Sequence, residues 1–180
     1  MAPHIALHEI GVTFTPHPLS FARNETRSAD FLALNPEGKV PLLLVDGQRL
    51  TEVTAILFWL ARRFPAARLL PRTLDGQAQA IAWMAFLAAT VHPSRRQGPE
   101  VAAATYRRAD ARLGARTWAL GQYSVVDIHL FRLFWRYAGP AGPDPVAFPN
   151  LSAHHARMLA RPAVQRTIAV ESAIGYELPA

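Results

Sequence analysis

The chain has 180 residues, of which 51% are hydrophobic and 18% are charged, with a formal net charge of +6. This composition suits one large or two small folded domains and excludes a disordered chain. The sequence contains no cysteine, which excludes a disulfide framework, thiolate metal ligands and a cysteine nucleophile within it. It contains no apolar run of membrane-spanning length and no signal-like opening segment, so we expect a cytoplasmic protein with no membrane partner.

The positive charge raises nucleic acid as a possible partner. Adjacent basic pairs occur at Arg62-Arg63, Arg95-Arg96 and Arg107-Arg108. These pairs fall on different predicted helices, and no aromatic residues for base stacking recur beside them. Lys39 is the one lysine, and all other basic residues counted in the net charge are arginines. This excess of arginine over lysine favours a bias in the coding sequence over a basic surface that binds nucleic acid. We therefore expect no nucleic-acid partner.

The N-terminal segment predicts a helix and then a strand. The helix begins at Ala2 and ends at Gly11, because glycine is common just beyond helix C-termini. Val12 to Leu19 is strand-like. A helix followed by such a strand implies an earlier parallel strand from which the crossover starts.

The stretch from Asn35 to Ala61 is the most informative. Asn35, Pro36 and Gly38 favour a turn, and Pro41 precedes the apolar strand 42–45. A proline there leaves Val40 extended, so its amide and carbonyl can face a ligand.

The same stretch continues as a hairpin and a helix. Asp46-Gly47 predicts a tight turn, with Gln48 to Leu50 returning antiparallel. Thr51 is predicted to cap the next helix and Glu52 to lie in its first turn, beside free amides. Glu52 is either a helix-end acid or a ligand contact, and the surrounding motif favours ligand contact.

The rest of the chain is predicted to be helical. Residues 64–75 are punctuated by prolines and form the predicted boundary between a domain at 1–66 and a domain at 74–180. Apolar residues recur at helical spacing in five segments, with an irregular loop at 139–143; the segments are 77–91, 100–113, 124–137, 150–159 and 163–172. Ser124 and Asp127 form a predicted capping box.

Several side chains have plain structural interpretations. Six aromatic residues are predicted to lie in the interdomain and bundle core: Trp59, Trp83, Phe86, Phe131, Phe134 and Trp135. His154 and His155 are neighbours that point about a quarter-turn apart on a helix, so we interpret them as solvated surface residues. The spacing of the seven histidines predicts no metal site.

Several parts of the chain carry a family resemblance: the motif around Val40-Pro41 and Thr51-Glu52-Val53, the opening helix, residues 83–92, the capping box, and Ala160 to Val164. Together they resemble the glutathione transferase family, in particular its bacterial beta class. The resemblance implies an α+β two-domain fold, a thioredoxin-like domain followed by an all-helical bundle. It also implies glutathione as co-substrate and no metal.

The resemblance assigns the glutathione contacts residue by residue. The Val40 main chain pairs with the cysteinyl amide of glutathione, next to Lys39 and to Pro41, which is cis in the family. Glu52 holds the γ-glutamyl end, and the Val53 amide meets the γ-glutamyl carboxylate. Many members of the family carry Ser where this chain has Val53, so this chain keeps the backbone amide but lacks a hydroxyl to bind the γ-glutamyl carboxylate.

Two departures from the family concern catalysis. The first strand, which ends at the residue serving the glutathione thiol, has no counterpart before Ala2, and we expect the gene product to begin upstream. The segment between His92 and Gly121 is also shorter than in relatives. His92 matches a histidine directed at the sulfur, where a neutral ring could accept the thiol proton. The alternative is a helix-end histidine without a chemical role, because Ala85 replaces the usual Asn partner.

We therefore expect a glutathione transferase that conjugates glutathione to small apolar electrophiles and forms a homodimer. Detoxification would be its role. The alternative is a non-catalytic scaffold or glutathione-binding module with the same fold.

Overall fold

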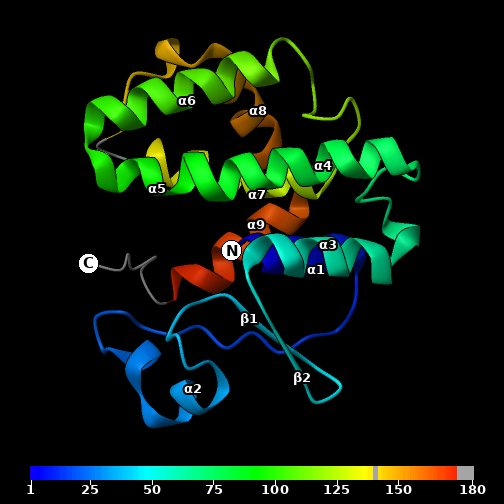
Figure 1. Cartoon of the computed structure of the whole chain (residues 1–180), viewed down its shortest axis with the longest axis vertical. Helices are drawn as coiled ribbons and strands as arrows, with labels where there is room; N and C mark the ends of the chain where they lie inside the picture. The colour runs from blue at the N-terminus through cyan, green and yellow to red at the C-terminus, as the bar shows by residue number, and fades with distance from the viewer. Residues whose placement is uncertain (140–141, 174–180) are drawn as a thin grey trace.

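A computed structural model describes residues 1–139 and 142–173 of the chain. Its first part contains α1, α2, the strands β1 and β2, and α3, with α1 and α3 lying side by side (Figure 1). This is the thioredoxin-like part, and a helical part follows, as predicted. The bounds of the first five elements are Ala2–Ile10, Ala29–Leu34, Leu42–Val45, Gln48–Thr51 and Val53–Arg63.

Helix α1 confirms the predicted opening helix. Gly11 adopts a left-handed conformation with φ of 80°, and its N–H donates to the Leu7 carbonyl at 3.0 Å. Such a conformation is readily available to glycine because it has no Cβ. Ile5 and Ala6 are fully buried. The helix is therefore anchored on its inner face and ends where the sequence indicates.

The prediction of a strand over Val12 to Leu19 is wrong. The segment keeps an alternation in exposure, with Val12 and Phe14 partly buried and Thr13 and Thr15 exposed, but it contains no strand. A strand needs a neighbour to complete its ladder of hydrogen bonds. Among the described residues, the only sheet is the pair β1 and β2, and this segment has no partner in it.

The hairpin confirms the prediction from Asp46-Gly47. Leu42 pairs with Thr51 and Val45 with Gln48 in an antiparallel register. Asp46 and Gly47 both have positive φ, 47° and 76°, which is the backbone of a tight hairpin turn.

The helical part agrees with the predicted segments, with one difference at its start. Helix α4 begins before Gln77, because the Thr73 side chain caps it by accepting from the Gly76 amide at 3.2 Å. Its helical course continues through a π-helical segment and the short α5. The elements are α4 Leu74–Phe86, the π segment Leu87–Val91, α5 His92–Ser94, α6 Pro99–Leu113, α7 Val125–Tyr137, α8 Pro149–Leu159 and α9 Pro162–Ser172.

Short 3-10 turns lie at 25–27 and 65–67 in the first part of the chain and at the boundary, and at 95–97 and 145–147 between helices of the helical part. The predicted loop at 139–143 lies partly outside the described residues, as does the end of the predicted second domain. Within the described part of the chain, no helix combines the length and the apolar character needed to cross a membrane.

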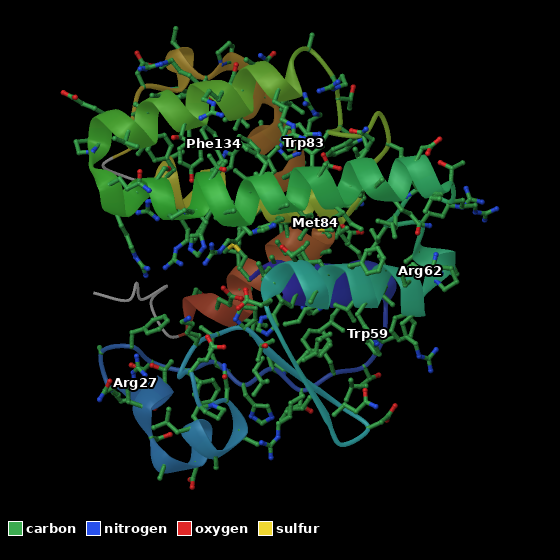
Figure 2. The ribbon with its side chains drawn as sticks, in the orientation of Figure 1. Arg27, Trp59, Arg62, Trp83, Met84 and Phe134 are labelled. Atoms are coloured by element: carbon green, nitrogen blue, oxygen red, sulfur yellow. The ribbon has the colours of Figure 1, made fainter. Side chains whose placement is uncertain are left out.

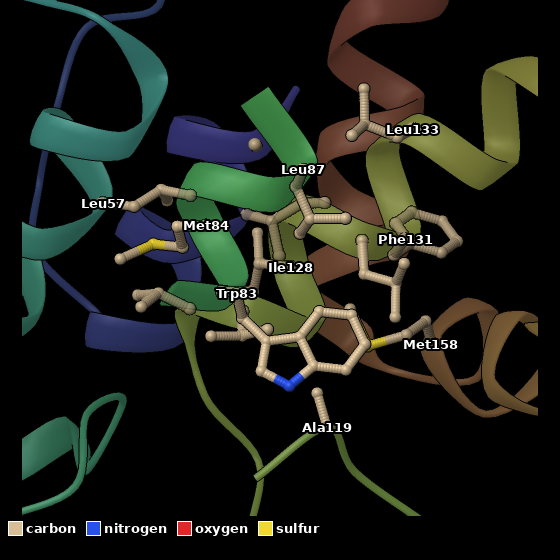
Figure 3. Close-up of a cluster of buried hydrophobic side chains, with 14 of the residues drawn as sticks. Leu57, Trp83, Met84, Leu87, Ala119, Ile128, Phe131, Leu133 and Met158 are labelled. Carbon is tan, nitrogen blue, oxygen red and sulfur yellow. The ribbon is translucent and has the colours of Figure 1, made fainter. Parts of the chain in front are cut away.

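One apolar core joins the two parts. Figure 3 shows Leu57 of α3 near Met84 and Leu87 of the α4 region, with Ile128 and Phe131 of α7 in the same cluster. Of the predicted core aromatics, Trp83, Phe131 and Phe134 are buried, whereas Trp59, Phe86 and Trp135 are partly buried against the core.

A polar cluster also joins the first helix to the last. The Arg161 guanidinium donates to both carboxylate oxygens of Glu9, at 2.6 and 3.0 Å, and lies 3.6 Å from the centre of the Tyr123 ring. Tyr123 Oη donates to Glu9 at 3.0 Å. The bidentate geometry fixes α1 against the start of α9 and so orients the thioredoxin-like part on the helical part.

Candidate functional site

A tight turn positions the entry to the hairpin. The buried Asn35 side chain donates to the Lys39 carbonyl at 2.7 Å and accepts from the Glu37 amide at 3.2 Å. Gly38 has φ of 63°, and a Cβ there would come within 2.9 Å of the Thr26 carbonyl oxygen. The turn therefore requires glycine at Gly38. Arg27 supports the turn from outside by donating to the Glu37 carbonyl at 3.3 Å (Figure 2).

Val40 leaves this turn with unpaired backbone groups. The Val40–Pro41 peptide bond is cis, and 44% of the Val40 residue surface is exposed. Among the described residues, neither the amide nor the carbonyl of Val40 forms a hydrogen bond. An exposed donor and acceptor on one residue can pair with an extended peptide as an added strand does.

The register of the hairpin brings the second group of predicted residues to the same place. Because Leu42 pairs with Thr51, Val40 and Pro41 lie at the open end of the hairpin, next to Glu52 and Val53. Lys39 is exposed and pairs with Glu37 at 2.8 Å. The Glu37 carboxylate raises the pKa of Lys39, and the charge of Glu52 adds to this effect.

The prediction that Thr51 caps α3 is wrong. Thr51 ends β2, and Glu52 occupies the N-cap position with φ of 63° and ψ of 118°, without a side-chain cap bond. This backbone is uncommon for a residue with a Cβ. It leaves the Glu52 side chain exposed and the amides of Val53 and Thr54 without an acceptor among the described residues. Lys39, Val40 and Glu52 are exposed and Pro41 and Val53 are half-buried; we name these five residues the hairpin-end site.

His92 lies in the helical part, at the start of α5. Its side chain is exposed at the surface, yet partial desolvation, followed by the positive charge of Arg132, lowers the pKa of His92 to about 4. The ring is therefore neutral at physiological pH. It is also a weak base, which narrows the chemistry that it can perform.

The interpretation of His154 as a solvated surface residue is wrong. His154 is 1% exposed, and its Nε2 lies 3.1 Å from Asp127 Oδ1. The Asp127 carboxylate also accepts from the Ala119 amide at 2.8 Å and from the Ser124 amide at 2.9 Å. The capping box is confirmed, and it belongs to a buried network that no local pattern indicates, because Ala119 and His154 are brought in by the fold.

The described residues contain no group of three or more His, Cys, Asp or Glu side chains that could hold a metal ion. The chemistry available at the hairpin-end site is that of recognition. Backbone donors, a backbone acceptor and one carboxylate lie at the open end of the hairpin, and groups of this kind can bind a peptide that carries an ammonium group and a carboxylate.

Two family models together match most of this chain. Residues 1–62 match the family model of the glutathione S-transferase N-terminal domain, and residues 80–162 match that of the C-terminal domain. Glutathione S-transferase GstA of Escherichia coli O157:H7 is 31% identical over 189 residues, covering 95% of this chain and 93% of that protein.

Two solved structures are similar over nearly the whole chain. The beta class glutathione S-transferase of Sphingomonas chungbukensis is 35% identical with a TM-score of 0.80, covering 98% of this chain and 94% of that one. A sphingomonad glutathione S-transferase complexed with glutathione is 33% identical with a TM-score of 0.82 and the same coverage. The chain thus belongs to the glutathione S-transferase family.

Proposed function

We propose that this protein binds glutathione at the hairpin-end site and conjugates it to small electrophiles that have an apolar body. The observation that carries the proposal is the convergence of the Val40 backbone, the Glu52 carboxylate and the Val53 amide at one end of the hairpin. Their donors and acceptors complement the cysteinyl main chain and the γ-glutamyl end of the tripeptide. A solved relative in complex with glutathione supports this choice of ligand.

In this mechanism the site binds and orients the tripeptide through groups that the fold holds in place. The extended Val40 backbone pairs with the cysteinyl amide, and Glu52 accepts from the γ-glutamyl ammonium group. The Val53 amide, at the positive end of α3, donates to the γ-glutamyl carboxylate. Lys39 adds a positive charge beside these groups.

We propose a limited role for His92. An imidazole with a pKa of about 4 is a poor acceptor for a thiol proton, but its neutral ring N–H can donate to a thiolate. His92 would then stabilise the thiolate instead of removing the proton. Ultraviolet titration of bound glutathione tests this, because His92→Phe should raise the pKa of the bound thiol and an unchanged thiol pKa would exclude the role.

The test of glutathione binding is Glu52→Gln, measured by calorimetry. The substitution replaces a charge-assisted bond with a neutral one while keeping the side-chain shape, so affinity should fall by about 1–3 kcal/mol. Arg108→Gln, an exposed arginine on α6, is the matched control and should leave affinity unchanged. Equal affinities for the parent and Glu52→Gln, with both folded, would show that Glu52 is a helix-end acid only.

A second candidate function is a non-catalytic glutathione-binding module. The weak basicity of His92 favours it, as does the absence of cysteine from the sequence. Turnover of 1-chloro-2,4-dinitrobenzene with glutathione separates the two functions, because binding without turnover identifies the module.

We also propose that the protein is a cytoplasmic homodimer that acts in detoxification. Exposed apolar side chains support a subunit interface on the helical part, since Leu74 and Ile81 lie on one face of α4 and are 82% and 47% exposed. Sedimentation at micromolar concentration distinguishes this dimer from a monomer.

A further inference from the structure

A group of nitrogen-bearing side chains lies on α7 and on the turn that follows α5. His129, Arg132 and Arg136 are spaced by three and four residues and therefore share one face of α7. Helix α7 packs on the π segment Leu87–Val91, which leads through α5 into this turn, and the charge of Arg95 acts on Arg132. We name Arg95, Arg132 and Arg136 the arginine cluster.

The arginine cluster borders the first helix. The charges of Arg132 and Arg136 both act on the amino group of Met1, at the N-terminal end of α1, and α1 packs on α7. After desolvation, the positive charges of Arg132, Arg136 and Arg95 also help to lower the pKa of His92. The helix that carries Arg132 and Arg136 therefore packs on α1 and on the π segment that leads into His92, the histidine proposed to face the thiol.

Arg132 has no acidic partner of its own among the described residues. Glu171 is the carboxylate whose charge acts on both Arg132 and Arg136, but it already pairs with the Met1 amino group and with His4 Nδ1 at 3.0 Å. Within the described part of the chain, Arg132 forms no hydrogen bond or ion pair. Burial lowers the pKa of Arg132, and it lowers the pKa of Arg136 to about 10. An arginine guanidinium stays protonated at neutral pH.

A partly buried guanidinium without a partner is costly, because its charge has lost water and gained no counter-charge. His129, which is fully buried, adds two ring nitrogens that have no hydrogen-bond partner among the described residues. A planar guanidinium with several free donors is suited to a carboxylate, which it can bind through two parallel bonds.

We propose that Arg132 binds a carboxylate on the electrophile, so that the second substrate is an anionic molecule with an apolar body. Resting on the proposed function, this inference refines the class of electrophile that the site accepts. Arg132 acts as a specificity-determining residue, and Arg95 and Arg136 contribute positive charge around it.

The test compares two product-like ligands that differ by one carboxylate. Calorimetry with S-benzylglutathione and S-(4-carboxybenzyl)glutathione should show roughly tenfold tighter binding of the carboxylate form to the parent protein. Arg132→Gln should remove this preference and leave the affinity for S-benzylglutathione unchanged. Arg132→Lys, which keeps the charge and loses the planar fork, should retain part of it.

Arg108→Gln is the matched control, because it removes the same charge from an exposed position on α6. It should keep the full preference. Thermal unfolding of each variant checks that the protein is folded, so that loss of the preference for the carboxylate ligand is not attributed to misfolding. Equal binding of the two ligands by the parent protein would overturn the inference and leave the proposed glutathione site intact.

A probe without the tripeptide separates this inference from the proposed function. The parent protein should bind 4-chloro-3-nitrobenzoate in the absence of glutathione, and Arg132→Gln should not. Benzoate binding that depends on Arg132, in a protein that binds neither glutathione conjugate, would support the anion site and refute the glutathione site. Failure to bind the benzoate as well would refute both.

Discussion

The hairpin-end site and the start of α7 both collect polar groups, but they do so in opposite ways. At the hairpin end, Val40 and Glu52 are exposed and their binding groups have no partner among the described residues. At the start of α7, Asp127 is fully buried, and its oxygens accept from two backbone amides and the Ser124 hydroxyl and lie beside His154.

This difference predicts that the hairpin-end site contributes mainly to ligand binding and the start of α7 mainly to the stability of the fold. A buried carboxylate with all of its bonds made contributes to folding, and removing it leaves several donors without acceptors. An exposed ridge with free donors contributes little to folding and keeps its bonds for a ligand. Substitutions in the two regions should therefore change different measurements.

Asp127→Asn should produce the largest loss of stability. The amide cannot accept all of the bonds that the carboxylate accepts, so buried donors lose their partners, and the free energy of unfolding should fall by about 3 kcal/mol. Urea denaturation measures this loss. Equal free energies of unfolding for Asp127→Asn and the parent would contradict the prediction that Asp127 stabilises the fold.

The control for Asp127 is Asp75→Asn. Asp75 is exposed in the first turn of α4, where an acid interacts with the helix dipole alone. Its replacement should cost less than about 1 kcal/mol. A similar loss for both substitutions would mean that burial of Asp127 adds nothing to its contribution.

A second prediction concerns His129, whose pKa is lowered to about 3 by burial, with smaller effects from Arg132 and His92. Between its unfolded pKa near 6.5 and about 3, the unfolded chain binds a proton that the folded protein does not. Stability is therefore lost as the pH falls through this window, by roughly 2 kcal/mol from this group at pH 5.

His129→Leu should remove this part of the pH dependence. Urea denaturation at pH 7 and pH 5 should show a smaller difference for the variant than for the parent. His17→Leu, at an exposed position, is the control and should keep the parental difference. An unchanged pH dependence in His129→Leu would show that His129 takes up its proton without unfolding.

The sequence predicts the parts of this protein that are decided locally. Helical periodicity, the Asp46-Gly47 turn and the Ser124 capping box depend on a few neighbouring residues, and all three are confirmed. The family resemblance adds the cis Val40–Pro41 bond and the order of the two parts.

The predictions that fail depend on contacts between distant residues. His154 reaches Asp127 across 27 positions, so its own helix gives no sign of burial. Val12 to Leu19 has the pattern of a strand, but pairing depends on a neighbouring strand and not on the segment itself. The sequence does not single out Arg132 as a candidate site residue because arginines occur throughout it, and only the fold packs its helix α7 on α1.

The smallest effect is expected at Glu52. Its φ of 63° and ψ of 118° are unfavourable for a residue with a Cβ, at a cost of order 1–3 kcal/mol, and glycine removes that cost. The greater freedom of glycine in the unfolded chain offsets part of the gain. Glu52→Gly should therefore raise the free energy of unfolding by about 1 kcal/mol, measured by urea denaturation, while weakening glutathione binding.

Glu52→Gln separates the two contributions, because it keeps the Cβ and removes only the charge. It should leave the free energy of unfolding unchanged, within about 0.5 kcal/mol, and should lose affinity as Glu52→Gly does. If Glu52→Gly were less stable than the parent, the left-handed backbone at Glu52 would not be a strained conformation retained for binding. The hairpin-end site would then contribute to folding as the start of α7 does, and the contrast between the two regions would be lost.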